Sequence, residues 1–129
     1  GTSRLHCELR GHDSWVICCA FSTANTSGCM LVSAADCSVR VWDCETSECV
    51  RELRGHTGSV RAVAWESVKW NYIASAGNDY TVRLWNVARG SQVDLFKGHT
   101  DVIRALAFSP DGLILASSAE DTTIRLYHV

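Results

Sequence analysis

Residues 98–129 read GHTDVIRALAFSPDGLILASSAEDTTIRLYHV, and the fold class can be inferred from their pattern. It contains three runs rich in strand-forming residues, at Ile103 to Phe108, Ile114 to Ser118 and Ile124 to His128. Turn-forming Gly, Pro, Asp and Ser residues separate the runs, which is the pattern of short consecutive strands. The stretch therefore predicts an all-β structure.

The same pattern occurs twice more, earlier in the chain. Gly-His pairs stand at residues 11–12, 55–56 and 98–99, in steps of 44 and 43 residues. Strands with an aromatic residue follow, at Trp42, Trp85 and Tyr127, and an aspartate lies six residues before each of these aromatics. Such a period indicates a repeat architecture. We expect one array over residues 1–129, with units at about 4–43, 47–86 and 91–129.

The first strand of each unit is apolar on both faces. In Val60 to Trp65, Ala62 and Ala64 lie on one face, whereas Val63 and Trp65 lie on the other. A strand that is apolar on both faces is covered on both faces. Four strands per unit, in units that cannot cover their own faces, predict stacked sheets of the β-propeller kind.

These features together resemble the WD40 repeat family over practically the entire chain. The resemblance rests on the Gly-His pairs, the turn Phe108-Ser109-Pro110-Asp111-Gly112, the strand Leu115-Ala116-Ser117-Ser118 and the dipeptide Trp42-Asp43. The later units depart from that dipeptide with Trp85-Asn86 and Tyr127-His128. The resemblance implies a propeller segment of three four-stranded antiparallel blades.

The resemblance also implies a role for the recurrent polar residues. In such blades the histidine, a second-strand serine, the turn aspartate and the tryptophan form a buried hydrogen-bonded tetrad, in which each polar group has a partner. The corresponding residues are His12, Ser33, Asp36 and Trp42, then His56, Ser75, Asp79 and Trp85, then His99, Ser117, Asp121 and Tyr127. Ser33 lies three residues before Asp36, whereas the other two serines lie four residues before their aspartates, so the first turn is one residue shorter.

Ser, His and Asp are also the members of a nucleophilic triad. Catalysis needs one exposed constellation beside an oxyanion hole, whereas three copies at the period of the repeat favour scaffolding. The chain also lacks a Gly-x-Ser-x-Gly elbow and a His-Glu-x-x-His motif. We therefore expect no enzymatic activity.

Charge, hydropathy and cysteine content limit the kinds of partner and cofactor that we expect. The net charge is −2 and no run approaches the roughly 18 apolar residues of a membrane span, so we expect neither nucleic acid nor membrane as a partner. Seven cysteines, an odd number, all lie in the first 49 residues without a Cys-x-x-Cys pair. This arrangement favours free thiols over a disulfide framework or a metal site. We expect no cofactor, and a cytoplasmic location with the nucleus left open.

The family's partner-binding face is commonly formed by the loops that enter the first strand and join the second strand to the third. The corresponding residues are Trp15, Ile17 and Ala35, then Ser59, Arg61 and Asn78, then Val102, Arg104 and Glu120. The candidates for binding are Trp15, Ser59, Arg61, Asn78, Arg104 and Glu120, and the two arginines suit an acidic peptide. The alternative is that the arginines only solvate the channel entrance and that Trp15 packs on a neighbouring blade.

Three blades cannot close a ring, because every blade needs a neighbour on both faces. The chain is then either part of a longer propeller, or copies associate head to tail into a six- or nine-bladed ring. Leu5 to Leu9 resembles the fourth strand of a blade. We expect a non-catalytic scaffold that binds protein or peptide within a larger intracellular protein. The alternative is a self-associating structural module.

Overall fold

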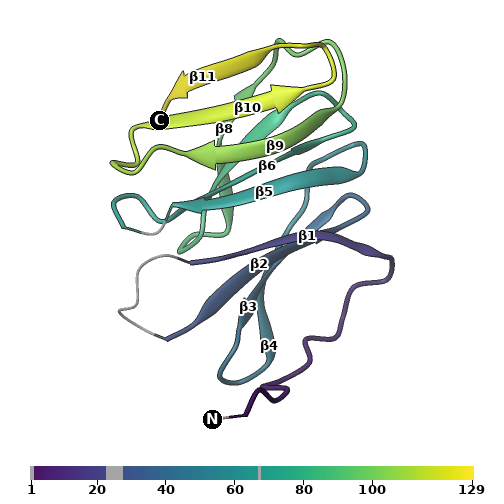
Figure 1. Cartoon of the computed structure of the whole chain (residues 1–129), viewed down its shortest axis with the longest axis vertical. Coiled ribbons are helices and arrows are strands. Elements are labelled where there is room, and N and C mark those ends of the chain that lie inside the picture. The colour runs from purple at the N-terminus through teal and green to yellow at the C-terminus, as the bar shows by residue number, and fades with distance from the viewer. Residues whose placement is uncertain (1, 23–27, 67) are drawn as a thin grey trace.

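The computed structural model describes residues 2–22, 28–66 and 68–129. These residues contain eleven strands and no helix. The strands form three antiparallel sheets, one after another along the chain. Figure 1 shows the sheets stacked on one another, with the N-terminus at one end of the stack and the C-terminus at the other.

Each sheet is a simple meander in which consecutive strands pair. The first sheet comprises β1 (Val16–Phe21), β2 (Met30–Ala35), β3 (Ser38–Asp43) and β4 (Glu48–Leu53). The second comprises β5 (Val60–Glu66), β6 (Tyr72–Gly77), β7 (Val82–Asn86) and β8 (Ser91–Phe96). The third comprises β9 (Ile103–Phe108), β10 (Ile114–Ala119) and β11 (Ile124–His128). The all-β blades predicted from the repeats are confirmed, and the stack of sheets is open rather than closed into a ring.

The expectation of a strand at Leu5 to Leu9 is wrong. Residues 2–14 form no strand. A strand requires an edge to pair with, and the sheet that lacks its fourth strand ends on β11, at the far end of the stack (Figure 1). The third sheet accordingly has three strands instead of four.

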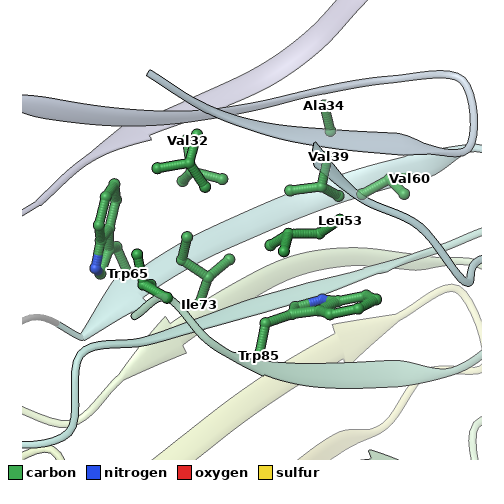
Figure 2. Packing of buried hydrophobic residues seen from close by; sticks show 10 residues of the cluster. Val32, Ala34, Val39, Leu53, Val60, Trp65, Ile73 and Trp85 are labelled. Carbon is green, nitrogen blue, oxygen red and sulfur yellow. The ribbon is translucent and has the colours of Figure 1, made fainter. Parts of the chain in front are cut away.

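The core lies between the sheets, as the two apolar faces predict. Val32, Val39 and Leu53 of the first sheet pack against Val60, Ile73 and Trp85 of the second (Figure 2). All six are buried. A second cluster joins the second sheet to the third. It includes Leu84, Ile103 and Leu115.

The arrangement brings the first strands of the three sheets side by side. Figure 1 shows β1, β5 and β9 as neighbours across the stack, and all three begin at the same end of it. A Gly-His pair precedes each of these strands in the sequence. At that end the backbone N–H of Val60 donates to the carbonyl of Asp36 at 2.8 Å, which joins the first sheet to the second. We call this end of the stack the Gly-His rim.

Candidate functional site

The second blade holds a complete buried network behind the Gly-His rim. Asp79 Oδ2 lies 2.9 Å from Nδ1 of His56, and Nε2 of His56 lies 2.7 Å from Oγ of Ser75. A carboxylate can only accept, so Nδ1 carries the proton and Nε2 accepts from the serine hydroxyl. The indole N–H of Trp85 donates to the same Oγ at 2.8 Å. The four residues are therefore mutually satisfied.

The third blade reproduces this network except at its aromatic member. His99 lies 2.7 Å from Asp121 Oδ2 through Nδ1 and 2.7 Å from Ser117 Oγ through Nε2. Tyr127 does not join them: its hydroxyl is buried without a hydrogen-bond partner. Its ring stacks on Phe96 of the second blade, with the centroids 4.3 Å apart. Tyr127 thus contributes packing between blades in place of a hydrogen bond.

The first blade lacks the aspartate of its network. His12 Nε2 lies 2.6 Å from Ser33 Oγ, and the indole N–H of Trp42 donates to that Oγ at 2.7 Å. Asp36 makes no hydrogen bond to His12, whose Nδ1 is buried without a partner. The short turn accounts for this, because Asp36 itself occupies the left-handed turn conformation at φ 50°. Its carboxylate instead accepts from Ser59 Oγ at 3.4 Å.

The surroundings of His56 favour its neutral form. Burial lowers the pKa of His56, and nearby Arg83 lowers it further, although Asp79 acts in the opposite direction. Burial opposes the charge on Asp79, but hydrogen bonds from Thr81 and His56 outweigh it, so the pKa of this carboxyl is lowered. A neutral imidazole between a carboxylate and a hydroxyl is the expected state of a structural hydrogen-bond network.

The rim residues are positioned by a β-bulge that recurs in every blade. The β5–β6 register passes from Val60↔Gly77 to Ala62↔Ala76, which leaves Arg61 unpaired. The same shift leaves Arg104 unpaired on β9 and Ile17 unpaired on β1. A bulge turns the side chain of the extra residue away from its regular position on the strand.

Two of the bulged residues, Arg61 and Arg104, bond to candidate binding residues in the turn between the second and third strands of their blade. Arg61 donates through Nε to Oδ1 of Asn78 at 3.1 Å. Arg104 forms an ion pair of 3.2 Å with Glu120. The backbone N–H of Asn78 in turn donates to the carbonyl of Ser59 at 2.9 Å. Ser59, Arg61 and Asn78 therefore form one group, and Arg104 and Glu120 form its counterpart on the third blade.

The first blade presents apolar side chains at the corresponding places. Trp15 is 85% exposed and Ile17 is also exposed, whereas Ala35 is buried. Ser59 touches Asp36 of this blade, so the first and second blades meet at the rim. The structure thus places all six candidate residues at the starts of the first strands or in the turns beside them.

Two threonines contribute to these networks without having been expected from the sequence. Thr81 Oγ1 donates to Asp79 Oδ1 at 2.8 Å, and Thr123 Oγ1 donates to Asp121 Oδ1 at 2.6 Å. The signal was a threonine two residues after each of these aspartates, which the first unit replaces with Ser38.

A recurrent arginine lies against the glycine of each Gly-His pair. A Cβ added to Gly55, which has φ 158°, would lie 2.9 Å from a guanidinium nitrogen of Arg83. A Cβ added to Gly11 would lie 2.7 Å from a guanidinium nitrogen of Arg40, and one added to Gly98 would lie 2.5 Å from a guanidinium nitrogen of Arg125. The backbone conformation favours glycine at these positions, because residues with a Cβ rarely adopt a φ between 150° and 158°, and the arginine of the same blade occupies the space beside each glycine.

The described part of the chain offers no metal site and no membrane-spanning helix. Among residues 2–22, 28–66 and 68–129, no three His, Cys, Asp or Glu side chains gather as metal ligands do. None of these segments forms a helix long and apolar enough to cross a bilayer.

Stacked four-stranded meanders with a polar network behind the entry of each first strand define a β-propeller repeat. The family model for the WD domain, G-beta repeat, matches residues 3–43, 47–86 and 90–128. The chain therefore belongs to the WD40 repeat family.

Curated relatives share parts of this chain. A probable E3 ubiquitin ligase complex SCF subunit, sconB, of Aspergillus terreus is 42% identical over 44% of the chain and 8% of its own length. Ribosome assembly protein 4 of Saccharomyces cerevisiae is 36% identical over 49% of the chain and 12% of its own length. Nuclear distribution protein PAC1 of Arthroderma otae is 43% identical over 55% of the chain and 16% of its own length. The matches thus span less than a fifth of each relative.

Proposed function

We propose that this chain is part of a WD40 propeller that binds a protein or peptide segment on the Gly-His rim, without catalysis. The observation that carries the proposal is the recurrent bulge, which turns Ile17, Arg61 and Arg104 out at equivalent positions of three adjacent strands. Exposed Trp15 adds the kind of aromatic anchor that dominates many interfaces.

The two arginines offer different electrostatics to a partner. Arg61 is held by the neutral amide of Asn78, so its positive charge is available. Arg104 is paired with Glu120, and both side chains are about half exposed, at 55% and 44%. Exposed ion pairs contribute only about 0–1 kcal/mol, so a partner carboxylate can displace Glu120. The partner we propose is a segment with an acidic group for Arg61 and an apolar side chain for Trp15.

The relatives support a scaffold within a larger intracellular protein. Their names describe a ubiquitin ligase complex subunit, a ribosome assembly protein and a nuclear distribution protein. A non-catalytic platform in the cytoplasm or nucleus is compatible with all three. The self-associating alternative gains no support from them, since the chain corresponds to a small part of each.

The test uses the full-length protein that carries this chain. A random peptide library is panned on it, and the affinity of the selected peptide is measured for Arg61→Glu and Arg104→Glu. Arg89→Glu, in the exposed turn at the opposite end of β7 and β8, is the matched control. We expect the Arg61 reversal to weaken binding at least about tenfold, the equivalent of roughly 1.4 kcal/mol.

We expect a smaller loss for the Arg104 reversal and none for the Arg89 reversal. Circular dichroism and unfolding curves verify that each variant is folded. Unchanged affinity in a folded Arg61→Glu variant would show that the arginine only solvates the rim, as in the alternative interpretation.

A further inference from the structure

A cavity of about 490 Å³ lies at the end of the first sheet opposite the Gly-His rim. Its lining residues are His6, Cys7, Leu9, Phe21, Cys29, Leu31, Cys44 and Glu45. Three of the seven cysteines therefore share one cavity that contains no rim candidate. All seven cysteines are free thiols in the structure.

Cys29 and Cys44 face each other across the β2–β3 hairpin. The strand ladder ends at the pair Met30↔Asp43, and one residue beyond it the backbone N–H of Cys44 donates to the carbonyl of Cys29 at 3.0 Å. Residues directly opposite in an antiparallel pair point to the same face, and in a hydrogen-bonded pair their Cα atoms lie about 5.5 Å apart. Disulfides span Cα separations of about 4.4 to 6.8 Å.

Cys7 completes the thiol cluster from the N-terminal segment. Its Sγ lies 3.7 Å from the carbonyl oxygen of Cys44. At the corresponding contact of the second blade, Arg51 donates to the carbonyl of Val87 at 3.2 Å and also to that of Ala88. Thiols of Cys7 and Cys44 therefore stand where the equivalent contact pairs the guanidinium of Arg51, on β4 of the first sheet, with Val87 of the second blade.

We propose that Cys29 and Cys44 are an oxidative modification site, and that they form a disulfide at the expense of a low-molecular-weight disulfide such as oxidised glutathione. The Cys29 thiolate attacks one sulfur of the oxidant, and the oxidant's S–S bond breaks to release one glutathione. Cys44 then displaces the second glutathione from the mixed disulfide. Two protein thiols are oxidised, one glutathione disulfide is reduced, and the two protons leave on the two glutathione thiols.

The surroundings set the order of these steps. Cys29 is exposed, whereas Cys44 is buried. Burial, together with the neighbouring thiols of Cys29 and Cys7 and the carboxylate of Asp43, raises the pKa of Cys44 to about 11. Since the thiolate is the nucleophile, Cys29 reacts first and the attack by Cys44 limits the rate.

The bond is expected to be reversible. Directly opposite Cβ atoms of a hydrogen-bonded pair lie about 5.5 Å apart, whereas a disulfide brings them to about 3.8 Å. The strand ends must therefore be drawn together, and strained disulfides are the more easily reduced ones. The disulfide would link the start of β2 to the end of β3, next to the contact between Cys7 and the carbonyl of Cys44.

The test treats the reduced full-length protein with oxidised glutathione, blocks the remaining thiols and maps tryptic peptides by mass spectrometry. We expect a linked pair of peptides, 11–40 and 41–51, with fragmentation that assigns the bond to Cys29 and Cys44 and with loss of most of the free Cys44 signal. Reduced glutathione should reverse the bond. It should be lost in Cys29→Ser and in Cys44→Ser.

Cys49→Ser is the matched control, because Cys49 is exposed, lies on the same tryptic peptide as Cys44 and faces no cysteine across its strand pair with Trp42. This variant should retain the bond. A bond that uses Cys7 or Cys49, or a glutathione adduct on Cys29 that never resolves, would overturn the proposal. The wild-type map decides the question even if a serine variant fails to fold.

Discussion

At the scale of single residues, the aromatic residue of each network can contribute packing, a hydrogen bond or both. Trp42 and Trp85 do both, since each is buried and each donates to a serine hydroxyl. Tyr127 keeps only the packing, on Phe96. Its buried, unpartnered hydroxyl carries a desolvation cost that no hydrogen bond offsets.

Removing the polar atom should therefore have opposite consequences in the two blades. Trp85→Phe deletes a donor and shrinks a buried side chain, and we expect the free energy of unfolding to fall by about 3 kcal/mol. Tyr127→Phe deletes only the unpartnered hydroxyl, and we expect no loss or a gain of up to about 1 kcal/mol. Urea unfolding of the two variants beside the wild type measures both. A hydroxyl that is hydrogen-bonded in solution would instead lower the free energy of unfolding on its removal. The loss in Tyr127→Phe would then reach about 2 kcal/mol, the cost of leaving a buried partner unsatisfied.

At the scale of elements, the β2–β3 turn shows how one missing residue changes a hydrogen-bond network. This turn is closed by the pair Ala35↔Ser38, so that Asp36 and Cys37 alone connect the strands. In the second blade the last pair is Ala76↔Val82, and the longer turn lets Asp79 reach His56. The shorter turn instead directs Asp36 toward Ser59 of the neighbouring blade.

Restoring the missing residue should repair the first network. An asparagine inserted between Ala35 and Asp36 reproduces the spacing of the second blade, and we expect the aspartate to bond Nδ1 of His12 and to stabilise the fold by about 1–2 kcal/mol. Urea unfolding measures the gain, and a crystal structure of the variant shows the bond. The control is an asparagine inserted between Thr46 and Ser47 in the β3–β4 turn, which should bring no gain. Equal effects of the two insertions would contradict this account.

The sequence predicted the elements well and their irregularities poorly. Strand positions followed from the spacing of the repeats, because a period constrains every copy at once. The hydrogen bonds among His56, Ser75 and Asp79 were implied by the resemblance to the WD40 family, and the structure contains them. The bulge at Arg61 could not be foreseen, since it depends on how two strands pair and leaves no mark in the composition of either. The segment Leu5 to Leu9 was misjudged because its pattern suits a strand, but the edge that it would need is not beside it.

At the scale of the whole molecule, each sheet depends on its neighbours. The inner faces of all three sheets are buried in the two clusters between them. The outer face of the third sheet leaves Ile124 72% and Leu126 66% exposed, and β11 has an unpaired edge. Exposed apolar faces and free edges are sites of unspecific association.

The isolated chain of 129 residues should therefore form a mixture of sizes. We expect light scattering over a range of concentrations to give a mass that rises with concentration and has no plateau. Replacing Ile124 and Leu126 with threonine, which keeps strand propensity but reduces apolar area, should lower the apparent mass. A single stable mass of two or three chains would instead favour the self-associating ring.

At most positions of a β-sheet a residue must both pair in the strand ladder and present a suitable side chain, and the recurrent bulge removes the first of these requirements. Positions 17, 61 and 104 have no partner in the strand ladder, so the register of the sheet places no requirement on which side chain stands there. Isoleucine and arginine already occupy equivalent places. On the proposed function, side chains at these three positions could be exchanged one blade at a time without altering the strand ladder, once the bonds of Arg61 to Asn78 and of Arg104 to Glu120 are allowed for.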